Sequence, residues 1–488
     1  MKQEILSLEP TPLWEIFYEI TQVPHTSHHL DDITKFIINF AEKHSLDYEK
    51  DSAGNIIIRK KATSGMSGRK GLILQAHMDM VGQKESDNTH DFEKDPIIPY
   101  IDGDWVTAKG TTLGADNGIG MAAILAVLGS KEISHPELEA LFTVDEETGM
   151  FGANGLSRDS LKGTIMINTD SEVDDCIFIG CAGGIDFKAK FAYAEETICN
   201  AEELKAFRIT LGGLDGGHSG ADIHLGRANS NKMIFRFLKF ITEGYGARLS
   251  SVKGGDVRNA IPRETEAVIV LHKEDADDFT EEVKLFEQLY AQEYRGIEDG
   301  IFLKAGEVDM PQTIIPEDVE KRLISAVVAT PDGVDRMIPG IPDVVETSSC
   351  LSIIQTSQDE TFIQVMVRST MASRKYSRIS SLGSLYMLAG ADIEIFGDYP
   401  GWVPNQKSPI LKIAKACYKY NFGKEPIAKI MHAGVECGII SSICSKLDII
   451  SIGPNIVDPH SPAERVSISS VDKFWTLLNC LIKNIPEK

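Results

Sequence analysis

The stretch GLILQAHMDM, residues 71–80, decides the fold class of this chain. Its apolar first part predicts a buried strand, and the polar residues His77 and Asp79 stand where that strand ends. Three further apolar runs end in acids or lead into a loop that carries a histidine: ALFTVDEE (140–147), GTIMINTDSE (163–172) and LDIISIG (447–453). Helical patterns alternate with these runs, which predicts an α/β fold with a sheet between layers of helices.

The composition excludes several classes of protein. Of the 488 residues, 42% are apolar and 25% are charged, as in an ordinary globular chain. The net charge of −23 repels nucleic-acid phosphates and anionic lipids, so we expect neither as a partner. No apolar run reaches the roughly 18 residues of a membrane span. The eight cysteines are sparse and irregularly spaced, which indicates reduced thiols and a cytoplasmic location.

The middle of the chain follows a different pattern. Between residues 186 and 393, a rhythm of helix, strand and helix appears twice. This predicts an inserted α+β domain, doubled, with helices on one face of antiparallel strands. Residues 1–185 and 394–488 then form the two parts of one α/β domain.

Five motifs at predicted strand and helix ends carry groups that can do chemistry. They are HMD (77–79), GTTLGADNG (110–118), VDEETG (144–149), Asp170 after its strand, and DPHSPAE (458–464). Taken alone, each also suits a helix cap or a solvated turn. The glycine-rich loop lacks the lysine of GxxxxGK[ST], so we exclude a phosphate loop.

Taken together, the motifs indicate a metal centre. The carboxyl ends of strands in an open α/β sheet converge on one site. Imidazoles and carboxylates, with no thiolate among them, suit Zn²⁺ or a similar ion. Five ligands exceed one tetrahedral site with an open position, but they fit two ions that share a bridging carboxylate. One further carboxylate remains as a general base.

In this order the motifs resemble those of the dinuclear-zinc exopeptidase family, which includes aminoacylases and glutamate carboxypeptidases. The segments PHTSHH, GGLDGGHSGADIHLGRANS and MHAGVECGI are similar to a dipeptidase branch of that family. The resemblance implies two divalent ions, Zn²⁺ first, with Co²⁺ or Mn²⁺ as substitutes. It implies these roles: His77 and Asp170 bind one ion, Glu147 and His460 bind the other, Asp116 bridges them, Asp79 orients His77, and Glu146 is the general base.

The resemblance also gives the inserted domain, residues 186–393, the role of a lid and dimerisation domain. It implies that His218 binds the substrate carbonyl oxygen and that Arg368 binds the C-terminal carboxylate, with Asn259 near the same end. Glu436 is the candidate residue for binding the free amino group of the substrate. A homodimer is expected, although a doubled lid also allows His218 to act within one chain.

The function that the resemblance implies is hydrolysis of unblocked dipeptides, Xaa-His dipeptides included, by a hydroxide held between the two ions. Two enzymes on the same dizinc core remain as alternatives, an N-acyl amino acid amidohydrolase and a tripeptide aminopeptidase. A non-catalytic metal-binding protein is a third alternative, but it does not explain why both the base and all five ligands are present. The histidines at 25, 28 and 29 lack matching carboxylate strand ends, so packing or capping roles are expected for them.

Overall fold

The structure, a computed structural model, describes residues 2–339, 341 and 344–488. The chain divides into two compact units. The first comprises the residues up to Cys181 together with Trp402–Ile430 and Val435–Lys488. The second comprises Ala182–Gly401 and Met431–Gly434. The second unit extends beyond the predicted insertion because strand β21 (Asp392–Tyr399) pairs with β9 (Gly183–Ala192) and so stays with it.

The first unit contains an eight-stranded mixed sheet. Its strand order is β1 (Asp47–Lys50), β2 (Ile56–Lys60), β6 (Leu138–Thr143), β3 (Leu72–His77), β7 (Ile165–Asn168), β23 (Asp448–Ser451), β8 (Cys176–Cys181) and β22 (Ile427–Met431). The four predicted apolar strands, β3, β6, β7 and β23, are neighbours in the middle of this sheet and run parallel. Strands buried on both faces read as apolar runs, which is why the sequence revealed them.

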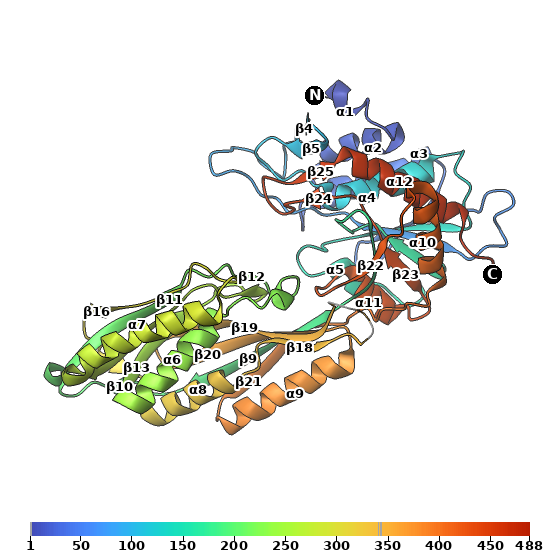
Figure 1. Ribbon diagram of the computed structural model, residues 1–488. Helices are drawn as coiled ribbons and strands as arrows, with labels where there is room; N and C mark the ends of the chain where they lie inside the picture. The colour runs from blue at the N-terminus through green and yellow to red at the C-terminus, as the bar shows by residue number, and fades with distance from the viewer. Residues whose placement is uncertain (1, 340, 342–343) are drawn as a thin grey trace. The chain divides into compact units, whose positions relative to one another are not determined.

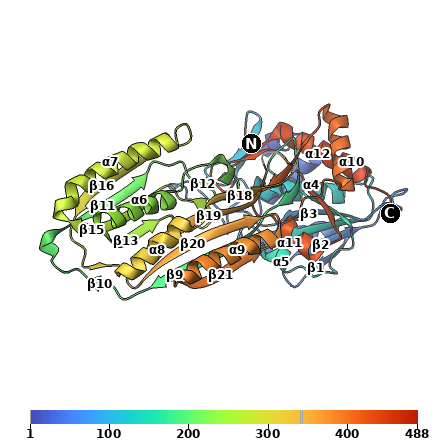
Figure 2. The same ribbon diagram turned by 60° about the horizontal axis from the view of Figure 1, so that its bottom comes forward.

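Helices cover both faces of this sheet (Figures 1 and 2). On one side lie α2 (Thr11–Thr21), α3 (Asp31–Lys43), α4 (Ala115–Gly129), α10 (Pro409–Phe422) and α12 (Ile468–Lys483). On the other side lie the short helices α5 (Phe151–Asn154) and α11 (Glu436–Ile443). Helix α4 is buried on all sides, as its uniformly apolar sequence requires. Helix α1 (Lys2–Ile5) and a small sheet complete the unit; the sheet's order is β24 (Ile456–Val457), β25 (Arg465–Ser467), β5 (Trp105–Ala108) and β4 (Pro99–Asp102).

Serine is a favoured N-cap residue, but Ser27 lies four residues before α3 and does not cap it. The N-cap position of α3 is Leu30, whose side chain makes no capping hydrogen bond. The Ser27 hydroxyl instead donates a hydrogen bond to Asp79, 2.8 Å away. Asp31 and Asp32 occupy the first turn, where the helix dipole favours acids.

The second unit is built on a nine-stranded antiparallel sheet. The strands follow the order β16 (Phe302–Val308), β11 (Leu204–Gly212), β15 (Thr265–His272), β13 (Arg248–Gly254), β19 (Val345–Thr356), β20 (Glu360–Ser369), β9 and β21, and β18 (Gly333–Met337) pairs with β19. The helices α6 (Ser230–Tyr245), α7 (Ala276–Glu293), α8 (Glu317–Ala329) and α9 (Ala372–Leu388) lie side by side on it (Figure 1). The short elements are β10 (Glu196–Thr197), β12 (Gly217–His218), β14 (Ala260–Ile261), β17 (Thr313–Ile314), η1 (Ala201–Glu203), η2 (Ile223–Leu225) and η3 (Lys273–Asp275).

The sheet of the second unit has two halves that meet where β13 pairs with β19. The half with β11, β13, β15 and β16 carries α6 and α7, and the half with β9, β19, β20 and β21 carries α9. This is the doubled α+β arrangement that the repeated rhythm predicted. None of the helices in the described residues combines the length and the apolar character that crossing a membrane requires.

Candidate metal centre

Strand pairing in the first unit brings the chemically active motifs to one edge of its sheet. His77 is level with Thr143 in the register of β3 with β6, and Gln75 is level with Asn168 in the register with β7. All three strands run parallel, so the residues that follow them leave at the same edge. Asp116 reaches this edge from the first turn of α4.

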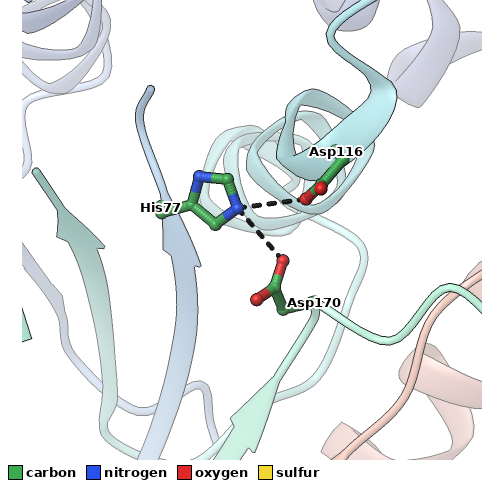
Figure 3. Close-up of side chains that lie close together, drawn as sticks. All are labelled: His77, Asp116 and Asp170. Atoms are coloured by element: carbon green, nitrogen blue, oxygen red, sulfur yellow. Dashed lines mark hydrogen bonds and ion pairs between the residues drawn. The ribbon is translucent and has the colours of Figure 1, made fainter. Parts of the chain in front are cut away.

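The Nε2 atom of His77 points toward two carboxylates (Figure 3). Its Nε2 atom is 3.1 Å from Asp116 Oδ1 and 3.2 Å from Asp170 Oδ1. Its Nδ1 atom is 3.0 Å from the carbonyl oxygen of Asp79, to which it donates, so Nε2 is free to act as a ligand. Burial disfavours the charged imidazole, yet Asp170 and Asp116 outweigh burial and hold the pKa of His77 well above its usual value. The surroundings of Nε2 therefore favour a positive charge.

His460 completes a second group on the other side of Asp116. Its Nε2 atom is 3.2 Å from Asp116 Oδ2 and 3.0 Å from Glu147 Oε1. Hydrogen bonds with these two carboxylates raise the pKa of His460 to about 11. The ligand atoms of Asp116, Glu147 and His460 all lie within 4.8 Å of one another, as do those of His77, Asp116 and Asp170. The structure thus brings together all five predicted ligands, with Asp116 in both groups.

Asp79 fixes the turn that carries the two glutamates. Its side chain is fully buried and accepts hydrogen bonds from the backbone N–H groups of Glu146, at 2.9 Å, and Glu147, at 3.1 Å. Burial raises the pKa of Asp79, but His77 and these donors outweigh it and lower the pKa to about 2. Its carboxylate lies 3.5 Å from His77 Nδ1, farther than its own carbonyl oxygen. Asp79 therefore contacts His77 most closely through its backbone carbonyl oxygen.

Glu146 extends from the same turn, and its carboxylate lies within 4.8 Å of ligand atoms of His77 and Glu147. Burial, with the nearby charges of Asp170 and Glu436, raises the pKa of Glu146 well above its usual value. No side-chain hydrogen bond holds this carboxyl among the described residues. A carboxyl whose pKa is raised in this way binds a proton more strongly than a free glutamate does, and a general base must accept a proton.

Glu172 is a carboxyl of this edge that sequence reasoning missed. Burial, together with the charges of Asp116 and Asp170, raises the pKa of Glu172 to about 8. The only signal in the sequence is its position two residues after Asp170.

Glu436 has a setting different from the one predicted. It is fully buried, and its Oε2 atom accepts hydrogen bonds from Gln75 Nε2 at 2.6 Å and from Thr143 Oγ1 at 2.7 Å. Its Oε1 atom has no partner among the described residues. Burial raises the pKa of Glu436 to about 7. A carboxyl that binds a substrate amine needs an accessible oxygen, so the amine-binding role is not supported.

Arg368 is a buried cation in the second unit. Its side chain is 3% exposed, and it donates to Tyr399 Oη at 2.9 Å and to Ser219 Oγ at 3.3 Å. Within the described part of the chain, no carboxylate lies within 4.0 Å of its guanidinium. A buried charge without a counter-ion is costly, so this arrangement favours the binding of an anion.

His218 lies beside Arg368 in a defined tautomer. The backbone N–H groups of Gly220 and Ala221 donate to its Nδ1 atom at 3.2 and 2.9 Å, so the proton of the neutral ring is on Nε2. Burial and Arg368 lower the pKa of His218 to about 4. Nε2 lies 3.4 Å from Arg368 Nη2, which places two donors next to each other, where an acceptor oxygen satisfies both.

Asn259 belongs to the same part of the second unit. Its carbonyl oxygen accepts a hydrogen bond from the Ser219 N–H at 2.8 Å. Its side-chain amide makes no hydrogen bond within the described residues. The structure therefore brings His218, Arg368 and Asn259 together around Ser219.

The chain is similar to known peptidases over most of its length. The profile of Peptidase family M20/M25/M40 matches residues 73–484. The cytosol non-specific dipeptidase of Escherichia coli K12 is 44% identical over 485 residues, which are 99% of this chain and 100% of that protein. The crystal structure of aminoacylhistidine dipeptidase from Vibrio alginolyticus is 43% identical and superposes with a TM-score of 0.92 over 100% of both chains. A tripeptidase from Staphylococcus aureus, 16% identical, shares the fold with a TM-score of 0.58 over 98% of this chain and 99% of its own. This chain therefore belongs to peptidase family M20/M25/M40.

Proposed function

We propose that this chain is a metal-dependent dipeptidase that hydrolyses unblocked dipeptides, Xaa-His dipeptides among them. The observation that carries the proposal is the position of Asp116, whose two oxygens lie within 3.2 Å of two different histidines. A carboxylate shared in this way suits a pair of divalent ions. The relatives named above, one a non-specific dipeptidase and one an aminoacylhistidine dipeptidase, support the substrate class.

The residues fit two divalent ions in both chemistry and charge. His77, Asp170 and Asp116 would hold one ion, and Glu147, His460 and Asp116 the other. Three carboxylates carry a charge of −3 against +4 from two divalent ions, so the site needs one further anion to become neutral. Nitrogen and oxygen ligands suit Zn²⁺ first, and Co²⁺ or Mn²⁺ also accept them. When bound, such ions lower the pKa of water to about 7 and stabilise negative charge on the substrate oxygen.

Glu146 is the proposed general base. Its carboxylate takes a proton from the attacking water and gives it to the leaving amine. Asp79 holds the turn that orients it, through the hydrogen bond from the Glu146 N–H. Because Glu147 from the same turn is needed as a ligand, Glu146 must stay unligated to carry out this role.

We propose that the second unit recognises the C-terminal carboxylate of the dipeptide and the carbonyl oxygen of its scissile bond. Arg368 binds the C-terminal carboxylate, since it is a buried cation with no carboxylate partner among the described residues. His218 donates from Nε2 to the substrate carbonyl oxygen, and Asn259 contributes near the same end. The fixed tautomer of His218 supports its part of the proposal.

We also propose a homodimer that forms through the second unit. Strand β21 is at the edge of the sheet, and its residues Asp392–Asp398 are exposed. Apolar side chains on it and at the end of α9 are open to solvent, with Ile395 50% and Leu388 84% exposed. A second copy that pairs along this edge would cover both the unpaired edge strand and the exposed apolar side chains.

The proposed location is the cytoplasm. All eight cysteines are free thiols, as expected in a reducing compartment. The Escherichia coli relative is named a cytosol dipeptidase, which supports the same location for this chain.

Metal titration tests the proposal. Enzyme stripped with a chelator should be inactive and should regain dipeptidase activity with two equivalents of Zn²⁺ or Co²⁺ per chain. Full activity in the stripped enzyme, or a plateau at one equivalent, contradicts the two-ion site.

A further inference from the structure

Glu464 is a buried carboxylate that no step of the proposed mechanism uses. It is 2% exposed and lies in the loop that carries His460. Its two oxygens accept four hydrogen bonds from consecutive backbone N–H groups of the loop that carries Asp116. The donors are Leu113 at 2.7 Å, Gly114 at 3.0 Å, Ala115 at 2.8 Å and Asp116 at 3.3 Å.

These donors belong to the start of α4, which has no side-chain cap of its own. Its N-cap residue is Gly114, in the left-handed region with φ of 72°. The first N–H groups of a helix have no partner within the helix and must find one elsewhere. Glu464 supplies that partner from a sequence distance of 348–351 residues. Without it, four backbone donors, three of them in buried hydrogen bonds, would lose their acceptor.

The other end of Glu464 is held in the loop that follows His460. Thr107 Oγ1 donates to the Glu464 carbonyl oxygen at 2.7 Å, and the Glu464 N–H donates to Ser461 O at 3.0 Å. His460 itself has φ of 60°, a conformation that a non-glycine residue rarely adopts unless its surroundings impose it. The side chain and backbone of Glu464 thus join the loops of Asp116 and His460 directly.

We propose that Glu464 is a positioning residue that sets the separation of Asp116 and His460 and thereby the metal affinity of the centre. It touches neither a ligand side chain nor the substrate, and it acts through the backbone of residues 113–116. The inference rests on the proposed function only in that Asp116 and His460 bind metal. A carboxylate is required here because its two oxygens together offer four acceptor lone pairs, one for each of the four N–H donors. An amide of the same size turns its NH₂ group toward N–H donors and loses half of the contacts.

The test compares E464Q with E139Q. Glu139 is a matched control in the same unit: it is 6% exposed, and its Oε2 accepts the N–H groups of Lys162 at 2.8 Å and Gly163 at 2.7 Å, away from the metal centre. Metal dissociation constants are measured by competition with a chelator, and unfolding temperatures are measured on the metal-free proteins. E464Q should weaken metal binding by about tenfold or more, as loss of a residue behind a ligand does. E139Q should lower the unfolding temperature but leave the dissociation constant within about twofold of wild type.

Equal dissociation constants for E464Q and wild type, with a lowered unfolding temperature, overturn the proposal because Glu464 is then only structural. If E464Q does not fold, E464D and T107V replace it. Aspartate keeps the charge but is too short to reach all four donors, and T107V removes only the hydrogen bond to the Glu464 carbonyl oxygen. Both should weaken metal binding less than E464Q is expected to, and two unchanged constants overturn the proposal. Failure of the proposed function is seen separately, as wild-type protein that does not bind two ions.

Discussion

His460 Nε2 lies 3.2 Å from Asp116 Oδ2, although 344 residues separate the two in the chain. The other oxygen of Asp116 is 3.1 Å from His77. The last part of the chain therefore completes a centre whose other members all come from the first 170 residues. Because Asp116 is common to both ligand groups, a change in one group should affect metal binding in the other.

Replacement of Glu146 by Gln should separate catalysis from metal binding. The amide cannot accept the proton of the attacking water, so kcat should fall by at least ~10²-fold. Metal content, measured on the same preparation, should stay at the wild-type value. E147Q is the matched control from the same turn, and it should lose metal as well as activity. Near-normal turnover by E146Q would falsify the role of the base.

Replacement of His460 by Ala should weaken metal binding rather than only slow the reaction. The change removes the nitrogen that lies 3.0 Å from Glu147 Oε1 and 3.2 Å from Asp116 Oδ2. Metal content after dialysis should drop below two equivalents per chain. H29A serves as the control, because the His29 ring pairs with Glu93, at 3.6 Å, and lies outside both ligand groups. Retention of both ions by H460A contradicts the ligand assignment.

Replacement of Arg368 by Lys should raise KM for dipeptides much more than it lowers kcat. Lysine keeps the charge but lacks the planar pair of donors that matches a carboxylate. Hydrogen bonds to a charged group contribute about 1.5–3 kcal/mol, which corresponds to a rise of roughly 10–100-fold in KM. A dipeptide amide, which has no carboxylate, should be hydrolysed poorly and equally by both enzymes. R258K is the control, since Arg258 already pairs with Asp186 at 2.6 Å. A KM for R368K that matches wild type removes Arg368 from substrate binding.

Stability should fall as the pH falls below about 6.5, in part because of His432. This ring is 7% exposed and hydrogen-bonded to Ser348 Oγ at 2.8 Å; burial, with Arg368 and His218, lowers its pKa to about 3. The folded-state pKa is below the unfolded value of 6.5, so between these values the unfolded chain binds a proton that the folded chain does not. The stabilisation that neutral His432 gives to the folded state is therefore complete above pH 6.5 and is lost as the pH falls toward 3.

The measurement is the free energy of unfolding in denaturant at pH 7 and pH 5, with chelator present. H432Q, which cannot titrate, should lose less stability between the two pH values than wild type does. Equal losses in the two proteins show that His432 is not responsible. For each protein, the change in the free energy of unfolding between pH 7 and pH 5 is compared. Any loss of packing that the substitution causes is present at both pH values and cancels in this difference.

Much of the first unit was predictable from the sequence because its signals are local. Strands such as 72–77 and 138–143 are apolar runs, and the polar residues that follow them mark the edge where ligands gather. The family and the α/β class were predicted from the ordered motifs, and the family profile and the relatives confirm both. The boundary of the second unit was less accurate, because β21 is assigned by its pairing with β9 and not by its own sequence.

Two roles that depend on long-range contacts were not predictable. In the sequence, Glu436 was a candidate to bind the substrate amine, and Glu464 was only the last residue of the DPHSPAE motif. Glu436 is buried and accepts hydrogen bonds from Gln75 and Thr143, and Glu464 caps a helix more than 340 residues away in the sequence. No local pattern reports that a carboxyl accepts backbone N–H groups from a distant segment. Ser27 illustrates the same point, since nothing near it in the sequence shows that its hydroxyl donates to Asp79.

Hydrolysis of a small substrate panel by chelator-stripped enzyme, before and after addition of Zn²⁺ or Co²⁺, tests the central claim most directly. The panel contains β-Ala-His, Gly-His, Leu-Gly, Ala-Ala-Ala and an N-acetyl amino acid, with release of free amine as the readout. The account predicts no hydrolysis without metal and, with metal, hydrolysis of the three dipeptides only. Cleavage of the N-acetyl compound alone, or of Ala-Ala-Ala in preference to the dipeptides, contradicts the dipeptidase assignment. Dipeptide hydrolysis that persists in the stripped enzyme contradicts the metal centre itself.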